Sequence, residues 1–462
     1  MSKRTRAGGS EHARRVLMVA YFFPPMGDGG VFRSLKLARY LPEFGWEPVV
    51  LCGDAADYWV RDESLLAQLP PELERLVVGG LTGQGLLRRL RGGTARGGAA
   101  AGARSSRGFA RLRRLGDFCL LPDAYAGWIG PATRAGRQRL AAGDIRLIYS
   151  SSPPDSSHRV AQRLAAASGL PWVADFRDPW INLHLKTPPT PLHRFLHARM
   201  EAAVLARAQV VAVTEAWRRH YAARAARPPR LIRNGFDPAD VAAPVSAAAA
   251  VPSPLAARAT IEILHTGKLS LTRSARPVLA GLAALRAEQP ALAARVRLVF
   301  LGPRESDNEA AAAAAGVADL VRFEPPVPHA ESVARQAAAD LLLLIKHDDA
   351  RYKDLVPGKF YEYAAAGPPI LAVTPPGEIE SLIAEHGLGW VCRPEAQSMK
   401  TALEVAVQAL AAGRPPRTAP AAFSRREQAR AMAALFDELL DETLLTASGE
   451  KHSPGVQEGG PQ

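Results

Sequence analysis

The chain has 462 residues, more than a single hydrophobic core usually organises, so two or three domains are expected. Hydrophobic residues at 47% and aromatic residues at 6% exclude an intrinsically disordered chain, and no apolar run reaches the roughly 18 to 20 residues of a membrane-spanning helix. A formal charge of +13 leaves three classes open: a nucleic-acid binder, a protein on an anionic membrane, and an enzyme for phosphorylated substrates.

The N-terminal region predicts a disordered segment over residues 1–15 and then a buried strand. The apolar run Val16–Phe23 is short, ends at Pro24-Pro25 and has no small-residue cleavage site after it, so a strand explains it better than a signal peptide. Three isolated cysteines without metal-ligand spacing indicate free thiols in a reducing compartment: Cys52, Cys119 and Cys392. These features together predict a cytoplasmic protein.

Strands and helices alternate over residues 16–238. The continuous apolar run Val16–Phe22 is typical of a parallel strand that is covered on both faces. Further buried strands are predicted at Glu47–Cys52, Leu147–Ser150, Trp172–Asp175 and Val210–Thr214, and helices at His158–Ser168 and Leu192–Arg207. This order predicts an α/β fold, with a first, doubly wound Rossmann-like domain.

One insertion in this domain, over residues 86–114, has a different composition. It carries nine arginines between Arg88 and Arg114, separated mainly by glycine and alanine, and no acidic residue. It is either a flexible, solvated loop or a loop that docks on anionic lipid or a phosphate-bearing acceptor, where each basic residue contributes about 1 kcal/mol. Nucleic-acid binding is not expected, because no recognition motif accompanies the arginines.

A second α/β domain is predicted over residues 259–423. The stretch 239–258 is rich in alanine, proline and serine and is predicted to be a linker. The strands of the second domain are expected at Ile261–His265, Val296–Leu301, Val321–Phe323, Leu341–Ile345 and Ile370–Val373. An amphipathic helix over 424–446 and a polar, disordered tail over 447–462 follow. Ligands of such sheets bind outside the carboxyl ends of the strands.

A glycine-rich turn, Gly27-Asp28-Gly29-Gly30, follows the first predicted strand and opens a helix. Glycines there let backbone N–H groups approach an anion at the helix N-terminus. Arg33, one turn into the helix, is a candidate to reach back toward a diphosphate. The full dinucleotide pattern G-x-G-x-x-G is absent, so a tight structural turn and an ordinary surface arginine stay open as alternatives.

Two other strand ends of the first domain carry polar residues. Ser151 follows one strand, with His158 in the helix after it, while Arg177 and Asp178 follow the next strand. An arginine and a carboxylate can hydrogen-bond sugar hydroxyls, and Asp178 could act as a general base. The alternatives are an Asp–Arg pair that braces a loop and a helix histidine that is packed in the core.

In the second domain, Lys268 and Arg273 follow the first strand, and two cations on a strand-to-helix loop suit a diphosphate. Asp354 and Glu362 stand eight positions apart, and their carboxylates suit sugar or ribose hydroxyls. The turn Pro357-Gly358-Lys359 between them presents backbone N–H groups. Asp354 could instead belong to a solvated charge cluster. No spacing of histidines or carboxylates in the sequence demands a metal.

The sequence resembles glycosyltransferase family 4, in the subgroup that acts in bacterial surface-polysaccharide assembly. The resemblance runs from Val16 to the terminal helix and rests on these stretches taken together: Tyr21–Arg33, Pro122-Asp123 with Trp128, Ser151–His158, Asp175–Trp180, Arg233–Asp237 and Pro357–Pro369. It implies a GT-B fold, in which two Rossmann-like domains face each other across a cleft, with a C-terminal helix.

The resemblance also implies a donor site, held mainly by the second domain. The family's E-x7-E motif maps onto Asp354 and Glu362, so Asp354 would face the donor sugar and Glu362 would bind the ribose hydroxyls. Lys268 and Arg273 match the family's basic pair on the donor diphosphate, and Val327 would line the nucleobase pocket. The donor would be a UDP- or GDP-sugar, and transfer would retain the anomeric configuration without a metal or other cofactor.

On the side of the acceptor, Gly29 and Gly30, which are also candidates for donor binding, would face the reaction centre together with Ser151, Arg177 and Asp178. Arg33 and His158 are further candidates on the acceptor side. The sequence departs from the family twice: Asp354 replaces the leading glutamate of the motif, and Ser151 stands where many relatives have a histidine. Both departures bear on the sugar contacts and the proton route.

The predicted function is transfer of a hexosyl or N-acetylhexosaminyl group to a lipid-linked or saccharide acceptor in cell-surface polysaccharide or glycolipid synthesis. The enzyme is expected in the cytoplasm, with the Arg88–Arg114 segment as its contact to the inner face of the plasma membrane. Two alternatives stay open. One is a GT-B nucleotide-sugar epimerase, which needs no acceptor, and the other is a non-catalytic, membrane-associated nucleotide-sugar-binding protein.

Overall fold

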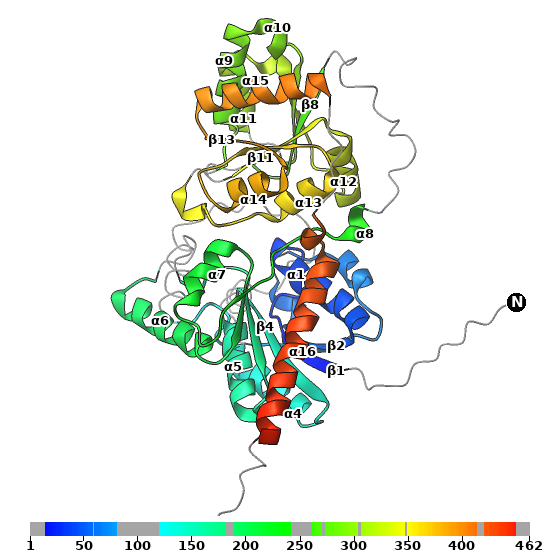
Figure 1. Ribbon diagram of the computed structural model, residues 1–462, viewed down its shortest axis with the longest axis vertical. Helices are drawn as coiled ribbons and strands as arrows, with labels where there is room; N and C mark the ends of the chain where they lie inside the picture. Colours follow the sequence, from blue (N-terminus) through cyan, green and yellow to red (C-terminus); the bar gives the residue numbers. More distant parts are fainter. Residues whose placement is uncertain are drawn as a thin grey trace, which may run out of the picture. The chain divides into compact units, whose positions relative to one another are not determined.

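The computed structural model describes residues 14–58, 60–80, 120–181, 188–241, 260–269, 273–303, 306–346, 349–413 and 420–449. The chain forms two compact units (Figure 1). The first contains the residues up to Val213, Trp217–Ile232 and the residues from Gln428 on, and the second contains Thr214–Ala216 and Arg233–Glu427. The predicted insertion 86–114 and nearly all of the predicted linker and of both predicted disordered ends lie outside the described residues.

The first unit is built on a seven-stranded parallel sheet with the order β3-β2-β1-β4-β5-β6-β7. Its strands are β1 (Arg14–Val19), β2 (Trp46–Gly53), β3 (Glu74–Val78), β4 (Ile145–Ser152), β5 (Trp172–Phe176), β6 (Gln209–Ala212) and β7 (Arg230–Leu231). The α-helices associated with it are α1 (Phe32–Tyr40), α4 (Ile129–Leu140), α5 (Ser156–Ser168), α6 (Pro191–Leu205), α7 (Glu215–Ala222) and α16 (Arg425–Gly449). Short 3₁₀ turns lie at η1 (Gly29–Val31), η2 (Leu41–Phe44), η3 (Ala55–Asp57) and η4 (Glu63–Gln68).

Apolar side chains cover both faces of this sheet, because successive residues of a strand point to opposite sides. Leu17 and Val19 of β1 belong to a core cluster with residues of α4 and α5, and Val16 and Met18 belong to a second cluster with residues of α1 and α16. From Gln428 on, the C-terminal helix is therefore part of the first unit. The strand β1 is buried on both faces, as its continuous apolar run predicts.

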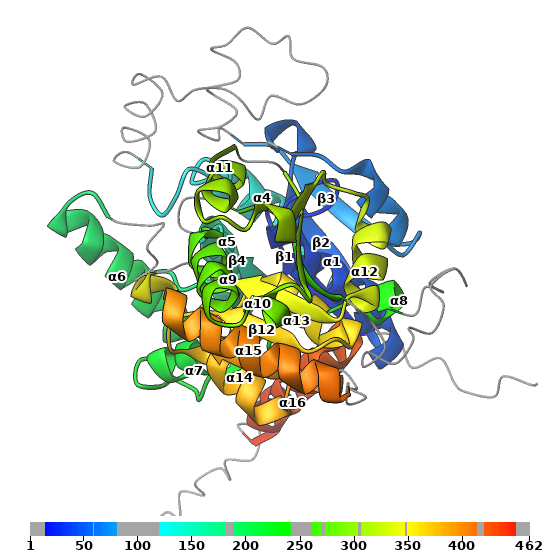
Figure 2. The same cartoon turned by 90° about the horizontal axis from the view of Figure 1, so that it is seen from above.

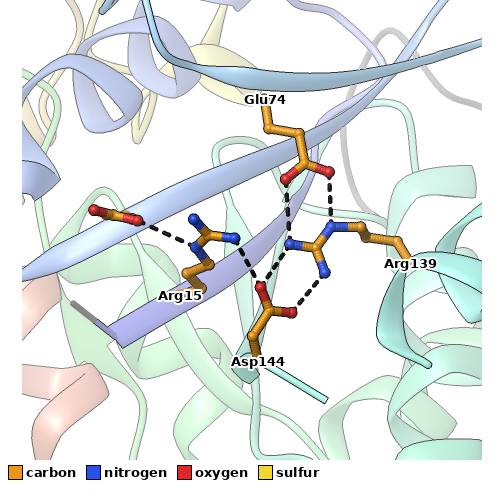
Figure 3. A network of polar contacts seen from close by, with 5 residues as sticks. Arg15, Glu74, Arg139 and Asp144 are labelled. Carbon is orange, nitrogen blue, oxygen red and sulfur yellow. Dashed lines mark hydrogen bonds and ion pairs between the residues drawn. The ribbon is translucent and has the colours of Figure 1, made fainter. Parts of the chain in front are cut away.

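A polar network connects Arg139 of α4 to the first residue of β3, Glu74, and to Asp144, which lies just before β4 (Figure 3). The guanidinium of Arg139 donates to both carboxylate oxygens of Glu74, at 2.7 and 3.2 Å, and to both of Asp144, at 2.6 and 2.9 Å. Arg15 of β1 donates to Asp144 at 2.7 Å. Hydrogen bonds from Arg139 hold the pKa of Asp144 well below its ordinary range. Arg139 thus has two carboxylate partners for its single charge.

The second unit is built on a six-stranded parallel sheet with the order β10-β9-β8-β11-β12-β13. The strands are β8 (Ile261–Thr266), β9 (Val296–Leu301), β10 (Val321–Glu324), β11 (Leu341–Ile345), β12 (Ile370–Val373) and β13 (Gly389–Cys392). The helices are α8 (Pro238–Val241), α9 (Arg276–Glu288), α10 (Pro290–Ala293), α11 (Ser306–Ala314), α12 (His329–Ala338), α13 (Gly358–Ala366), α14 (Glu378–His386) and α15 (Ala396–Ala412), with 3₁₀ turns η6 (Ala318–Leu320), η7 (Ala350–Tyr352) and η8 (Ala421–Phe423).

Helices cover this sheet on both faces as well. α9 and α15 pack side by side in one core cluster, and Figure 2 shows them adjoining. Gly281 of α9 permits the contact, because a Cβ there would lie 2.6 Å from the Met399 side chain. The other cluster contains Phe360 of α13 and Ile379 of α14. The two sheets confirm the predicted pair of Rossmann-like domains.

Most predicted strands are found within two residues of their predicted bounds, and the differences have physical causes. β1 ends at Val19 and not at Phe22, because Tyr21 and Phe23 are buried as loop residues and so extend the apolar run beyond the strand. The edge strands β3, β7 and β13 were not predicted; their burial is partial and their apolar runs are short. Among the described helices, none combines the length and the apolar character needed to cross a bilayer.

Candidate functional site

In the first unit, the carboxyl ends of β1, β4 and β5 meet at one edge of the sheet. These three strands are parallel neighbours, with Val19 paired to Ser150 and Ser151 paired to Asp175. The edge therefore brings the glycine turn after β1 and the polar residues after β4 and β5 into one place. All of the predicted first-domain site residues belong to these segments or to the helices that follow them.

Arg33 lies inside this unit and binds Asp175. Its Nε donates to Asp175 Oδ2 at 2.6 Å, and its Nη2 donates to Oδ1 at 2.9 Å and to the carbonyl of Ile232 at 2.9 Å. The Tyr149 hydroxyl donates to the same carboxylate at 2.5 Å. Because Arg33 is only 3% exposed and Asp175 is fully buried, this is a structural ion pair. The placement differs from the prediction that Arg33 reaches toward a ligand.

Arg177 organises the loops at this edge. It donates through Nη1 to the carbonyl of Gly30, through Nη2 to the carbonyl of Pro153 at 2.5 Å, and through Nε to the carbonyl of Ser152 at 3.2 Å. A Cβ on Gly30 would lie 3.0 Å from the Nη1 atom, so glycine fits this close approach. Arg177 therefore acts as a clamp between the loop after β1 and the loop after β4.

Gly29 leaves space around its Cα, since no heavy atom lies within 4 Å of a Cβ built there. Its N–H, however, donates to the Asp28 carboxylate at 2.6 Å, which caps the short turn η1. Of the two predicted glycines, Gly30 meets the Arg177 clamp and Gly29 faces open space. The hydrogen bond from Gly29 to Asp28 and the one from Arg177 to Gly30 thus hold this turn within the fold.

Asp178 is a partly buried carboxylate at the carboxyl end of β5. Burial raises its pKa, and the neighbouring Arg177 cation acts in the opposite direction. Arg177, which precedes Asp178, donates hydrogen bonds to carbonyls of the loop after β1 and of the loop after β4. Trp180, two residues after Asp178, is buried and donates to His197 Nδ1 at 3.1 Å. A carboxylate with a raised pKa on a braced loop can accept a proton from a hydroxyl.

His158 and Ser151 are both buried. His158 is fully buried in α5, with its Nδ1 2.8 Å from Ser150 Oγ and its ring packed on Phe176 at a centroid distance of 4.5 Å. Ser150 Oγ also accepts from Trp172 Nε1 at 2.8 Å, so the histidine belongs to a buried hydrogen-bond chain. His158 is therefore a core histidine, which differs from its predicted place on the acceptor side. Ser151 is 3% exposed and lies next to Tyr149.

In the second unit, the carboxyl end of β8 is joined to the first turn of α13. Lys359 Nζ donates to the carbonyl of Thr266 at 2.5 Å, and the Thr266 N–H donates to the buried Tyr363 hydroxyl at 2.8 Å. Gly267 has φ +99°, and a Cβ there would lie 2.8 Å from Lys359 Nζ. The lysine ammonium thus rests against the glycine backbone, in space that a side chain at residue 267 would occupy.

Three charged groups act on one another at this edge. Burial and the positive charge of Arg273 lower the pKa of Lys359 to about 8, while Glu362 acts in the opposite direction. Within the described part of the chain, the buried Nε of Arg273 has no hydrogen-bond partner. Two cations and one carboxylate therefore gather beside β8. Lys268 is exposed on the same loop.

The α13 segment carries the other predicted donor residues. Pro357 precedes the helix, Gly358 is its exposed first residue, and Asp354 is partly buried before them. Lys346 follows β11 and donates to the carbonyl of Lys353 at 2.7 Å. Burial lowers the pKa of Lys346 to about 8, and Asp354 acts in the opposite direction. The sequence reasoning missed Lys346, although a lysine directly after an apolar run was a usable signal.

Two further residues lie near this edge. Val327 is partly buried against the core cluster of α13 and α14. His265 at the end of β8 is buried, donates from Nδ1 to the carbonyl of Leu343 at 2.9 Å, and has a pKa held well below the ordinary value by burial and by the Lys359 cation. His265 was not predicted. Among the residues that the structure describes, no group of three or more His, Cys, Asp or Glu is arranged to hold a metal ion.

The architecture is similar to that of several solved structures. No protein-family model matches the sequence, and no curated protein matches it either. Solved structures do match. The chain superposes on sucrose-phosphate synthase from Thermosynechococcus elongatus with a TM-score of 0.54 and 16% identity over 94% of this chain and 100% of that chain. For Anabaena HepE in complex with UDP the TM-score is 0.51 and the identity 15%, over 94% and 100% of the two chains.

An epimerase is also among the matching structures. A putative UDP-N-acetylglucosamine 2-epimerase from Listeria monocytogenes superposes with a TM-score of 0.52 and 10% identity, over 93% of this chain and 98% of that chain. At these identities the similarity shows the fold, which is GT-B.

Proposed function

We propose that this protein is a glycosyltransferase with a nucleotide-sugar donor, and that the donor binds at the carboxyl end of β8. The observation that carries the proposal is the cluster of Arg273, Lys359 and Glu362 beside Gly267. Cations at a strand end suit a diphosphate, and a carboxylate suits a ribose diol. The fold supports the same assignment, since HepE carries UDP in a GT-B architecture.

Each group has a proposed task in donor binding. The Arg273 guanidinium, whose buried Nε has no hydrogen-bond partner among the described residues, would bind a phosphate oxygen. The Lys359 ammonium donates one hydrogen bond to the Thr266 carbonyl and would donate its remaining N–H groups to the diphosphate. Glu362 would accept hydrogen bonds from the ribose hydroxyls, and Asp354 from the donor sugar. Lys268 would add a second, exposed cation to the diphosphate site. Pro357 and Gly358 would present the N-terminal backbone of α13 to the same group, and Val327 would border the base.

These cations also have a proposed role in catalysis. When the bond to the sugar breaks, negative charge grows on the leaving diphosphate, and Arg273 and Lys359 would stabilise it. Preorganised donors of this kind commonly contribute about 3 to 4 kcal/mol each. We propose that Gly29, Gly30 and the Arg177 clamp shape the acceptor side, and that Asp178 accepts the proton of the acceptor hydroxyl.

The finer parts of the proposal come from the sequence motifs. They are membership of glycosyltransferase family 4, metal-independent transfer of a hexosyl or N-acetylhexosaminyl group with retention, and a lipid-linked or saccharide acceptor in surface-polysaccharide or glycolipid synthesis. The proposed location is the cytoplasm, with association of the Arg88–Arg114 segment with the inner face of the plasma membrane.

The epimerase is the second candidate, because an epimerase of the same fold is among the matching structures. A panel of UDP-, GDP- and other nucleotide sugars is first screened by thermal shift, since a ligand that binds the folded state raises the unfolding temperature. The selected donor is then incubated with the enzyme alone and with an acceptor panel. Release of nucleotide that depends on an acceptor supports the transferase, and a new sugar isomer from donor alone supports the epimerase.

A non-catalytic binding protein gives a third result in the same experiment. It would show a thermal shift with a donor but neither acceptor-dependent nucleotide release nor isomerisation. The absence of a thermal shift with every nucleotide sugar would contradict the proposed donor site itself.

A further inference from the structure

A second basic feature lies on the first unit, between α4 and α5. Six residues of these helices line a surface hollow of about 580 Å³: Gly130, Thr133, Arg134, Arg137, Gln138 and Arg163. This volume falls in the range of pockets that hold small molecules, which is roughly 300 to 1,000 Å³. None of these six described residues is acidic, and neither helix contains an aspartate or a glutamate along its length.

The helix packing explains why the arginines gather there. Gly136 of α4 contacts Leu164 of α5 so closely that a Cβ on the glycine would lie 2.6 Å from the leucine side chain. Arg137 is next to Gly136 in sequence and Arg163 is next to Leu164, so the close contact brings the two guanidinium-bearing residues to the same hollow. Arg134 lies one turn before Arg137 on α4.

Among the residues that the structure describes, no carboxylate pairs with the three arginines. Within the described part of the chain, Arg134, Arg137 and Arg163 are exposed and make no side-chain hydrogen bond or ion pair. Arg139 of the same helix differs sharply, because it has both Glu74 and Asp144 as partners (Figure 3). The pKa of the nearby Arg159 is lowered, by burial first and then by the charge of Arg163, which fits an excess of positive charge.

The hollow also contains polar groups suited to an oxyanion. Gly130 is the exposed second residue of α4, and a Cβ built on it would meet no described heavy atom within 4 Å outside its own stretch of helix. The N-terminus of a helix carries a partial positive charge. The Gln138 amide can donate to an oxyanion, whereas the Thr133 hydroxyl already donates to the carbonyl of Ile129 and only borders the hollow. Guanidinium groups bind phosphate oxygens bidentately.

We propose that the hollow between α4 and α5 is a binding site for a phosphate-bearing ligand, separate from the donor site. The ligand is either a soluble phosphorylated molecule or the phosphate of an anionic lipid headgroup, and both present the same oxyanion to the arginines.

The test uses a triple variant and a charge-matched control in the full-length protein. The site variant carries Arg134→Gln, Arg137→Gln and Arg163→Gln. The control carries Arg146→Gln, Arg207→Gln and Arg322→Gln, which are exposed arginines outside the described lining of the hollow. A third protein carries Arg273→Gln in the donor cluster. Binding of inorganic pyrophosphate is measured by calorimetry, and thermal unfolding checks that each variant is folded.

The proposal predicts that the site variant binds pyrophosphate at least about tenfold more weakly than wild type, the loss expected when charge-assisted hydrogen bonds are removed. The control should bind within about twofold of wild type by the same reasoning, because it leaves these hydrogen bonds in place. Arg273→Gln removes a cation of the proposed diphosphate site, so the pyrophosphate binding that this protein loses belongs to the donor site and the binding that it keeps belongs to the hollow. Equal weakening of the site variant and the control would overturn the proposal, because it would indicate net charge alone. Loss of binding only in Arg273→Gln would overturn it too, and would leave the donor site standing.

A vesicle experiment separates the two ligand sources. Sedimentation is measured with phosphatidylcholine vesicles that contain phosphatidylglycerol and with pure phosphatidylcholine vesicles. Binding to the anionic vesicles that the site variant loses and the control keeps assigns the site to lipid headgroups, and pyrophosphate binding without vesicle binding assigns it to a soluble ligand. If the site variant and the control behave alike with both probes, the proposal is wrong.

Discussion

The ion pair between Arg33 and Asp175 gives the sharpest test of how the first unit is held together. Replacing Arg33 with methionine keeps a long, unbranched side chain and removes the cation. The Asp175 carboxylate is then left fully buried with the Tyr149 hydroxyl but without its guanidinium partner, and the Ile232 carbonyl loses a donor. We expect a large loss of stability in Arg33→Met.

The size of the loss follows from burial. Exposed ion pairs contribute about 0 to 1 kcal/mol, whereas removing one partner of a buried pair costs about 3 to 5 kcal/mol. The higher range applies here, because Arg33 is 3% exposed and Asp175 is 0% exposed. The double variant Arg33→Met, Asp175→Asn removes the uncompensated charge and should recover about 1 kcal/mol or more of the loss.

Urea unfolding followed by tryptophan fluorescence measures these differences, since Trp46, Trp128 and Trp180 are buried in the first unit. The control is Arg286→Met, which breaks an exposed arginine–aspartate pair with Asp319 and should change stability little. If Arg33→Met unfolds like wild type but loses acceptor-dependent turnover, the structural role is wrong and the sequence prediction of a ligand contact is right.

Three further predictions concern the proposed site. Donor affinity should fall as the pH rises through about 8, because Lys359 loses its positive charge there. In calorimetry, Lys359→Arg should keep the donor affinity constant over this pH range. If the affinity of Lys359→Arg still falls as in wild type, the fall is assigned to Lys346 instead. Gly267→Ala should cost about 1 to 2 kcal/mol of stability and also weaken donor binding, whereas Gly316→Ala, at another positive φ with open space, should affect stability only. Asp178→Asn should lower turnover roughly 100-fold or more in steady-state assays at unchanged donor affinity, and equal turnover would exclude Asp178 as the base.

The sheets could be predicted because buried parallel strands leave continuous apolar runs. Val296–Leu301, Leu341–Ile345 and Ile370–Val373 were predicted with the bounds that the structure has. The edge strands could not be predicted in the same way, since β3 alternates half-buried and exposed residues and β7 has two residues. Continuous apolar runs in the sequence thus identify the central strands of a sheet better than its edge strands.

The candidate site was predicted less completely, because partners distant in sequence decide the role of each charge. Arg33 was placed near a ligand, and nothing local indicates its partner 142 residues later. His158 could have been assigned to the core, since it shares the buried face of α5 with Ala161 and Leu164. Lys359 was predicted as a donor residue, but its contact with Thr266 depends on the packing of α13 against β8.

The central claim is that a nucleotide sugar binds beside Arg273, Lys359 and Glu362. The most direct measurement is the affinity of the nucleotide sugar selected by thermal shift for wild type and for Glu362→Ala, by titration calorimetry, with Glu395→Ala as the control because Glu395 is an exposed carboxylate of the same unit. Loss of hydrogen bonds to a charged group predicts an affinity at least about tenfold lower in Glu362→Ala. The control should bind like wild type. Equal affinity of Glu362→Ala and wild type would contradict the account.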